Sequence, residues 1–158
     1  MSSREELNKI TEIMKQHPIC MLTTQGDALT TRPMTVAKVE DDGEVWFFSS
    51  AGTDLVSDID AEPEVNLSFM AKNQWLSVRG DAVTITSEPK ARELWNEAVA
   101  AFYPDGPESK ALILIRVRPE GAQFWETPGG AVATIVNWAK ARITGEPIDA
   151  GESHTVEL

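Results

Sequence analysis

The chain has 158 residues, of which 42% are apolar and 25% charged, and its formal net charge is −11. This composition is typical of a single globular domain, residues 1–158, with enough apolar side chains to form a core. No apolar run has the length of a membrane span, and no apolar segment of the signal-peptide kind follows the first residues, so the sequence predicts a cytoplasmic protein.

Acidic residues are concentrated in one part of the sequence. Between Val39 and Ala71 there are nine acidic residues and no Lys or Arg. Binding to nucleic acids or anionic membranes needs clustered basic side chains, so both are disfavoured as partners. The single cysteine, Cys20, allows neither an internal disulfide nor a cysteine metal cluster, and the two histidines lie far apart in the sequence. We therefore expect no dedicated metal site.

The first third of the chain is expected to form one helix and then a meander of antiparallel strands. Apolar residues recur at helical spacing in the opening segment, at Leu7, Ile10, Ile13 and Met14. His17-Pro18 ends this helix. Apolar and β-branched segments separated by turn residues then predict strands over residues 18–24, 28–39 and 45–48.

The middle of the chain predicts a short helix, two strands and a second helix. The short helix covers residues 54–59 and directs Leu55, Val56 and Ile59 inward. Strands follow over residues 64–70 and 75–85, with Gly80 as a bulge in the second. Ser87 and Pro89 then start a helix. Its expected core face consists of Leu94, Trp95, Ala98 and Phe102.

The last third predicts a buried strand over residues 111–117, which residues 122–125 either continue or pair with. A helix is expected over residues 131–143, and the polar last dozen residues are expected to fray. Six or so strands with helices at the start, middle and end indicate a mainly β protein, an antiparallel barrel with peripheral helices. Neither GxGxxG nor GxxxxGK[ST] is present, which excludes nucleotide binding through those loops.

Arg32-Pro33-Met34-Thr35 is the first segment with a possible chemical role. Pro33 removes a donor from the strand ladder, so this strand is expected to lie at an edge or to be bulged. Arg32 is either an ordinary exposed side chain or a guanidinium held for an anion, since its planar fork matches phosphate oxygens.

A second segment with a possible chemical role is Phe48-Ser49-Ser50-Ala51-Gly52-Thr53. Hydroxyls and free backbone N–H groups at the start of a helix can bind an anion, but the same residues also make an ordinary strand-to-helix turn with an N-cap. Covalent catalysis has little support, because Cys20 lies in a strand and neither histidine has an evident partner.

The order of these motifs resembles the pyridoxamine 5′-phosphate oxidase-like superfamily of FMN-binding split barrels, in its general stress protein branch. The most specific elements are Leu94-Trp95, the segment FYPDGP at residues 102–107 and QFWE at residues 123–126. The similarity runs from about Glu5 to the end of the chain. It implies an antiparallel split β-barrel that forms a homodimer with FMN at the subunit interface.

The resemblance also implies roles for particular residues. Arg32 would contact the FMN phosphate or ribityl chain, and backbone contacts to the isoalloxazine ring would come from Pro33, Met34 and Thr35. Phe48, Ser49 and Ser50 would line the phosphate end with Thr53 close by. Trp75 would lie near the ring or ribityl chain, and Trp125 would approach the flavin from the partner subunit.

The sequence departs from the family at two places. Leu55, preceded by Asp54, stands where relatives often have a phosphate-binding lysine, so FMN is expected to bind with modest affinity, on the hydroxyls and Arg32. An alternative is that Leu55 packs inward. Residues 126–139, which follow Trp125, contain no basic side chain to hold a substrate phosphate, and this disfavours vitamin B6 oxidation.

Three functions therefore remain open. The first is a flavin-dependent oxidoreductase in which FMN supplies hydride or electron transfer. The second is a non-catalytic flavin-binding or flavin-buffering stress protein on the same fold. The third, suggested by Leu55, is a dimer that binds no flavin.

Overall fold

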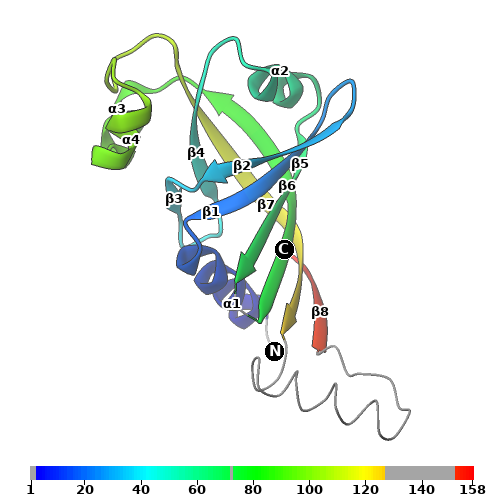
Figure 1. The fold of residues 1–158 in the computed structure, drawn as a ribbon. Coiled ribbons are helices and arrows are strands. Elements are labelled where there is room, and N and C mark those ends of the chain that lie inside the picture. The colour runs from blue at the N-terminus through cyan, green and yellow to red at the C-terminus, as the bar shows by residue number, and fades with distance from the viewer. Residues whose placement is uncertain (1–2, 72, 127–151) are drawn as a thin grey trace, which may run out of the picture.

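The computed structural model describes residues 3–71, 73–126 and 152–158. In chain order, the elements are α1 (Ser3–Gln16), β1 (Ile19–Gln25), β2 (Leu29–Thr35), β3 (Lys38–Val39), β4 (Val45–Ser50), α2 (Asp54–Ala61), β5 (Glu64–Ala71), β6 (Gln74–Ile85), α3 (Glu88–Leu94), α4 (Glu97–Phe102), β7 (Leu112–Glu126) and β8 (Glu152–Glu157). Figure 1 shows a strongly curled sheet with α1 at one end and α2 at the other.

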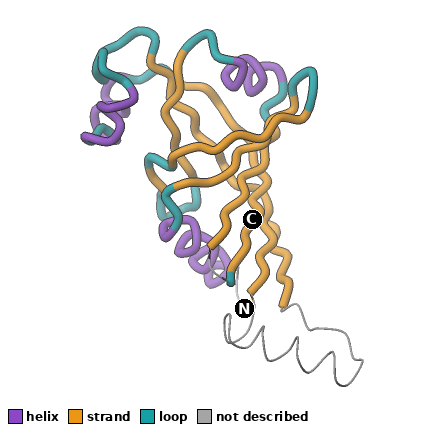
Figure 2. Tube along the Cα trace, viewed as in Figure 1, coloured by secondary structure: helices purple, strands orange, loops and turns teal. Residues whose placement is uncertain are grey.

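The strands form one sheet in the order β2-β1-β5-β6-β7-β4-β3, and β8 adds to β7. All strand pairs are antiparallel. β2 and β3 lie at opposite ends of this order, but only Val36 and Ala37 separate them in the chain. From Thr35 to Lys38 the backbone can span at most about 11 Å. The two ends of the sheet must therefore meet, and the sheet curls into a barrel that Figure 2 shows from the side.

The linker itself makes the closing hydrogen bonds. The backbone N–H of Val36 donates to the carbonyl of Pro18 at 2.8 Å, and that of Ala37 donates to the carbonyl of Trp46 at 2.8 Å. One bond joins the linker to the start of β1 and the other to β4. These bonds use backbone donors that would otherwise lack a partner at the seam of the barrel.

The barrel interior follows from the period-two pattern of its strands. In β5, Val65, Leu67 and Phe69 are buried while the residues between them are at least partly exposed. The helix α1 adds Ile10, Ile13 and Met14 to the same core. This is the face that the helical spacing predicted, so the N-terminal helix and its packing are confirmed.

β4 is buried on both faces. Phe47 belongs to the core inside the barrel, whereas Trp46 and Phe48 belong to a second cluster outside it, which the residues Ala91, Leu94 and Val99 of α3 and α4 cover. A strand covered on both sides needs no polar alternation, which explains the continuous apolar run in its sequence. The helical pair thus lies against the outer face of β4, beside the barrel seam.

Several sequence predictions are confirmed. The short helix α2 buries Leu55 and Ile59, and β6 shifts register between Arg79 and Gly80 as expected for a bulge. Residues 122–125 continue the strand that begins at Leu112, so β7 is one long strand. A mainly β fold with peripheral helices is confirmed, and the curled antiparallel sheet fits a split barrel.

The predicted meander of the first third is only partly right: its two hairpins form, but they are not joined by one continuous middle strand. β1 pairs with β2 and β3 pairs with β4, but the segment predicted as one strand over residues 28–39 breaks at Val36 and Ala37. The second neighbour of β4 is β7 rather than a strand of the meander. Closure of the barrel requires this break, because one uninterrupted strand could not change from one end of the sheet to the other.

The predicted second helix is two helices. α3 ends at Trp95, whose backbone is extended, and the side chain of Asn96 then caps α4 by accepting from the N–H of Val99 at 2.9 Å. The new helix starts in a different phase. Val99 is buried, while Ala98 and Phe102, two of the four expected core residues, are exposed.

The C-terminus also differs from expectation. Glu152–Glu157, within the last dozen residues, form β8, which pairs with β7 from Gly121 to Glu126. Val156 is 2% exposed, because its side chain completes the core at that edge. The helix expected over residues 131–143 lies outside the described residues. In the part of the chain that is described, no helix is long and apolar enough to cross a membrane.

The bulge at Gly80 offers a test of the β6–β7 register. A Cβ on Gly80 would collide with the main-chain carbonyl oxygen of Arg118, whereas a Cβ on Gly121 would meet first the end of the Arg79 side chain, at 2.8 Å. We expect Gly80→Ala to lower the free energy of unfolding by about 1–3 kcal/mol, as overpacking does. Gly121→Ala is the matched control and should cost less, as urea denaturation would measure. Equal losses would show that the bulge does not fix this close approach.

Candidate functional site

β2 lies at one end of the sheet and carries Arg32, Pro33, Met34 and Thr35. It pairs on one side only, with β1, where Pro33 lies opposite Met21. A proline is tolerated there because its missing N–H leaves no gap in the interior of a ladder. The expectation that this segment forms an edge strand is confirmed.

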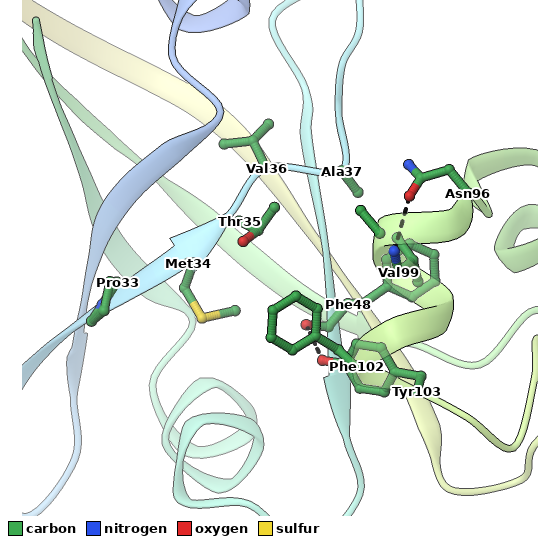
Figure 3. A pocket seen from close by; sticks show the side chains of 11 residues that line it. Pro33, Met34, Thr35, Val36, Ala37, Phe48, Asn96, Val99, Phe102 and Tyr103 are labelled. Carbon is green, nitrogen blue, oxygen red and sulfur yellow. Dashed lines mark hydrogen bonds between the residues drawn. The ribbon is translucent and has the colours of Figure 1, made fainter.

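A pocket of about 220 Å³ lies where the end of β2 and the following linker approach β4 and α4. Figure 3 shows the side chains from these elements around one hollow. The lining residues are Pro33, Met34, Thr35, Val36, Ala37, Phe48, Asn96, Ala98, Val99, Phe102 and Tyr103. None of these residues carries a formal charge at neutral pH, so the described wall of the pocket is apolar with a few neutral polar groups.

Aromatic side chains build one wall of the pocket. The ring of Phe48 packs edge-on against Trp95, with 5.7 Å between ring centroids, and at a tilt against Tyr103 at 6.0 Å. The Tyr103 hydroxyl donates to the carbonyl of Phe48 at 3.0 Å, as the dashed line in Figure 3 marks. Burial raises the pKa of Tyr103 above its usual value of 10.0, so the phenol stays protonated and keeps this bond at neutral pH.

The hydroxyls of the loop after β4 bind mainly to one another and to the chain. Thr53 is the N-cap of α2: its Oγ1 accepts from the N–H of Val56 at 3.4 Å and donates to the carbonyl of Ser50 at 2.9 Å. Ser49 is buried and lies 3.5 Å from Thr53, Oγ to Oγ1. Successive residues of a strand point to opposite faces, so Phe48 lines the outer pocket whereas Ser49 faces inward.

Arg32 lies in a polar cluster that joins three elements. Its guanidinium donates to Thr24 Oγ1 of β1 at 2.8 Å and forms an ion pair with Asp58 of α2, Nη2 to Oδ2, at 3.4 Å. Thr24 is buried and donates to the same Asp58 oxygen at 2.9 Å. Arg32 reaches α2 through its hairpin partner, because α2 packs against β1 and β6 and places Asp58 beside Thr24. A residue held in this way is more than an ordinary exposed arginine.

Asp58 is the residue of this cluster that sequence reasoning missed. It lies in a run of acidic residues that reads as a solvated helix face, and 26 residues separate it from Arg32. No local sequence pattern identifies Asp58 as a site residue, because its partners Thr24 and Arg32 lie on β1 and β2, far away in the chain. The pocket residues contributed by α4, among them Val99 and Phe102, were also missed as site residues, since the helix was predicted in the wrong phase.

Leu55 belongs to the core inside the barrel and is 6% exposed. Its side chain therefore does not reach the loop surface where a phosphate-binding lysine would be needed. The structure places it according to the alternative interpretation, in which it packs inward with Ile59.

Trp75 and Trp125 lie opposite each other in the β6–β7 pairing and do not line the pocket. They are at the end of this strand pair that is next to α1, where Lys9 pairs with Glu126 at 2.8 Å. Of the predicted site residues, the structure thus gathers Pro33, Met34, Thr35 and Phe48 around one pocket and places Arg32 against α2. Trp75 and Trp125 lie away from the pocket and from the Arg32 cluster.

Nucleophilic chemistry through Cys20 is disfavoured by its surroundings. Burial raises the pKa of the thiol to about 12, so the reactive thiolate is not formed at neutral pH. Among residues 3–71, 73–126 and 152–158, no cluster of His, Cys, Asp and Glu could hold a metal ion. The described lining is thus uncharged, and its one ionisable side chain, Tyr103, is hydrogen-bonded to Phe48.

Comparison with known proteins assigns the fold. The family described as pyridoxamine 5′-phosphate oxidase like matches residues 5–149. A candidate general stress protein 26 from Jannaschia sp. CCS1 is 23% identical, with a TM-score of 0.76 over 98% of this chain and 99% of that one. At this level of identity, the likeness concerns the fold alone.

A second solved structure is the general stress FMN/FAD binding protein of Xanthomonas citri. It is 30% identical, with a TM-score of 0.69 over 77% of this chain and 89% of that one. A Clostridium acetobutylicum protein related to general stress protein 26 of Bacillus subtilis, from the pyridoxinephosphate oxidase family, is 17% identical and has a TM-score of 0.69 over 80% of this chain and 92% of that one. A sequence search of curated proteins finds no match.

The position of Leu55 yields a prediction about stability. Leu55→Lys should lower the free energy of unfolding by about 2–4 kcal/mol, since it removes a buried side chain and introduces an unpaired cation. Ser57→Lys adds the same charge at an exposed position of α2 and should change stability little. Thermal denaturation of both variants would measure the difference. A stable Leu55→Lys protein would mean that this side chain can leave the core and face the loop.

Proposed function

The chain belongs to the pyridoxamine 5′-phosphate oxidase-like family, and we propose that it binds a flavin, with FMN as the cofactor. The observation that carries this proposal is the gathering of Pro33, Met34, Thr35 and Phe48 around one uncharged pocket. Those residues come from two separate sequence motifs, and the family resemblance of each motif implies contact with a flavin. The Xanthomonas citri relative, an FMN/FAD binding protein, supports the same conclusion.

The residues present fit a flavin unequally along its length. The aromatic and apolar wall suits the flat isoalloxazine ring, and the backbone of residues 33–35 offers polar groups to the ring edge. Phe48, which the resemblance assigns to the phosphate end, would then lie beside the ring instead. At the other end, Arg32, the hydroxyl of Ser50 and the first turn of α2 would hold the phosphate, while the Thr53 hydroxyl stays engaged as the N-cap. Asp54 and Asp58 lie on the same helix, so this end is less cationic than a phosphate prefers.

One chain supplies only part of such a site. Ligand pockets usually have volumes of about 300–1,000 Å³, and the pocket described here has about 220 Å³. We propose that a second copy of the chain supplies the missing wall and that the functional unit is a homodimer. A partner subunit would also explain how Trp125, which lies away from the pocket of its own chain, comes near a flavin.

An apolar row on the outer sheet face supports the dimer. Met70 lies opposite Trp75 in the β5–β6 pairing, and Ile19 lies on the outer face of β1, the strand that pairs with the other side of β5. These side chains are 74%, 40% and 58% exposed. An uncovered row of this kind on a sheet face is typical of an interface.

When bound, FMN supplies hydride or electron transfer. The role of this chain would be to bind the ring, exclude water from one face and leave room for a neutral apolar substrate. No charged side chain is present among the described lining residues to hold a substrate phosphate, which disfavours pyridoxamine phosphate. This arrangement supports an FMN-dependent oxidoreductase acting on an uncharged molecule.

A second candidate is a non-catalytic protein that stores or buffers flavin. It is favoured by the lack of an acid–base group in the described lining, where Tyr103 is the one ionisable residue and its hydroxyl is already engaged with Phe48. Consumption of NAD(P)H by the FMN-loaded protein would separate the two functions. A loaded protein that no reductant reduces would support binding alone.

Flavin fluorescence tests the proposed function. Titration of protein into FMN should quench or shift the flavin emission with a dissociation constant near the micromolar range, roughly −8 kcal/mol. Phe48→Ala removes one pocket wall and should weaken binding by about tenfold or more, in the range of a lost aromatic contact. Phe124→Leu, a smaller side chain inside the barrel and away from the pocket, serves as a control for lost packing. Unchanged flavin fluorescence at high protein concentration would reject flavin binding.

The dimer has its own prediction. Ile19→Glu places a charge in the apolar row and should shift the protein from dimer to monomer in sedimentation velocity, because a desolvated charge is costly at an interface. Gln25→Glu makes the same change of charge at an exposed position of the same strand and should leave the dimer intact. A wild-type protein that sediments as a 17.3 kDa monomer at micromolar concentration would contradict the dimer.

A further inference from the structure

We propose that Asp58 determines which flavin this site prefers, by weakening its hold on the terminal phosphate. The inference rests on the proposed function, since it concerns the end of the same site. The observation behind it is that the one cation assigned to the phosphate, Arg32, already has an anionic partner within the protein. That partner is the Asp58 carboxylate, 3.4 Å from Nη2.

The ion pair is built into the fold. Asp58 Oδ2 accepts from Thr24 as well as from Arg32, and Thr24 is buried. The hairpin turn leaves room for the carboxylate only because residue 26 is glycine, since a Cβ there would collide with Asp58. Three elements, β1, β2 and α2, thus hold the aspartate in place. Its position does not depend on a long flexible side chain that could swing away.

The charges near the phosphate end decide the preference. Arg32 contributes one positive charge, and Asp58 cancels it, while Asp54 adds a negative charge in the first turn of α2. Within the described residues, no other cation contacts this cluster. A phosphate carrying about −1.5 to −2 charges would therefore meet a guanidinium whose charge Asp58 already neutralises, and it would be repelled by the carboxylate.

Both partners of the ion pair are only partly shielded from water, with side chains 22% and 19% exposed. Water and salt therefore weaken the repulsion without removing it. The ribityl chain and the ring would be unaffected, because the pocket that takes the ring carries no charge. The consequence is a site that binds FMN and riboflavin with similar strength instead of strongly preferring the phosphorylated form.

The experiment compares the two flavins in wild-type protein and in one isosteric variant. Wild-type protein should bind FMN less than about tenfold more tightly than riboflavin. Asp58→Asn keeps an oxygen acceptor for Thr24 but removes the charge. It should tighten FMN by about tenfold, the size expected for two charges several Å apart near a protein surface, and leave riboflavin within about twofold. Added salt should reduce the gain.

Asp60→Asn is the matched control, because it removes the same charge from the same helix at a residue that accepts from Thr84 and not from Arg32. It should change neither affinity. Equal shifts for both flavins in Asp58→Asn, or no shift for FMN, would overturn the inference while flavin binding stands. A wild-type preference for FMN of a hundredfold or more would overturn it without any variant. A wild-type protein that binds neither flavin would end both proposals.

Discussion

The shortness of one linker determines the architecture of this protein. Val36 and Ala37 join strands at opposite ends of a seven-strand path, so the sheet has to curl until its ends meet. Closure makes the inner face of the sheet into the core. It also brings β2, an edge strand with a proline, next to β4, and so places residues 33–35 on the opposite side of the pocket from Phe48. Without that short connection, the two sides of the pocket would not face each other.

The second requirement is the burial of β4 on both sides. Its inward residues complete the barrel, and its outward residues support α3 and α4, of which α4 provides the far wall of the pocket. Phe48 and Tyr103 link the two layers through a ring contact and a hydrogen bond. The pocket is therefore positioned by packed secondary structure, with one side formed by a strand and the other by a capped helix. Sites built this way are more rigid than sites made of loops.

Much of the fold could be predicted from the sequence, because local patterns carry it. Each of these patterns depends only on residues close together in the chain. They are the spacing of Ile10 and Met14, the alternation in β5 and the glycine at the bulge. The features that were missed depend on contacts between distant residues. Asn96 restarts a helix that composition alone would continue, and β8 is stable because Val156 reaches a core formed mainly by earlier strands.

In the candidate site, too, local motifs could be predicted from the sequence, whereas contacts between distant residues could not. The motifs at residues 32–35 and 48–53 could be recognised, and four of their residues line the pocket. The role of Asp58 could not be recognised, because it depends on an ion pair with Arg32, which lies on another element. Leu55 shows the converse: a position that alignment with relatives assigns to the phosphate end belongs to the core here.

The pocket between β2 and α4 is where we expect the flavin ring to bind. Hydrogen–deuterium exchange of the protein with and without saturating FMN tests this most directly, because it reports which backbone segments the ligand protects. We predict slower exchange in residues 33–37 and in α4, with little change at the β1–β2 hairpin tip around Gly26. Protection confined to other segments, or none at all under saturating FMN, would contradict binding at this pocket.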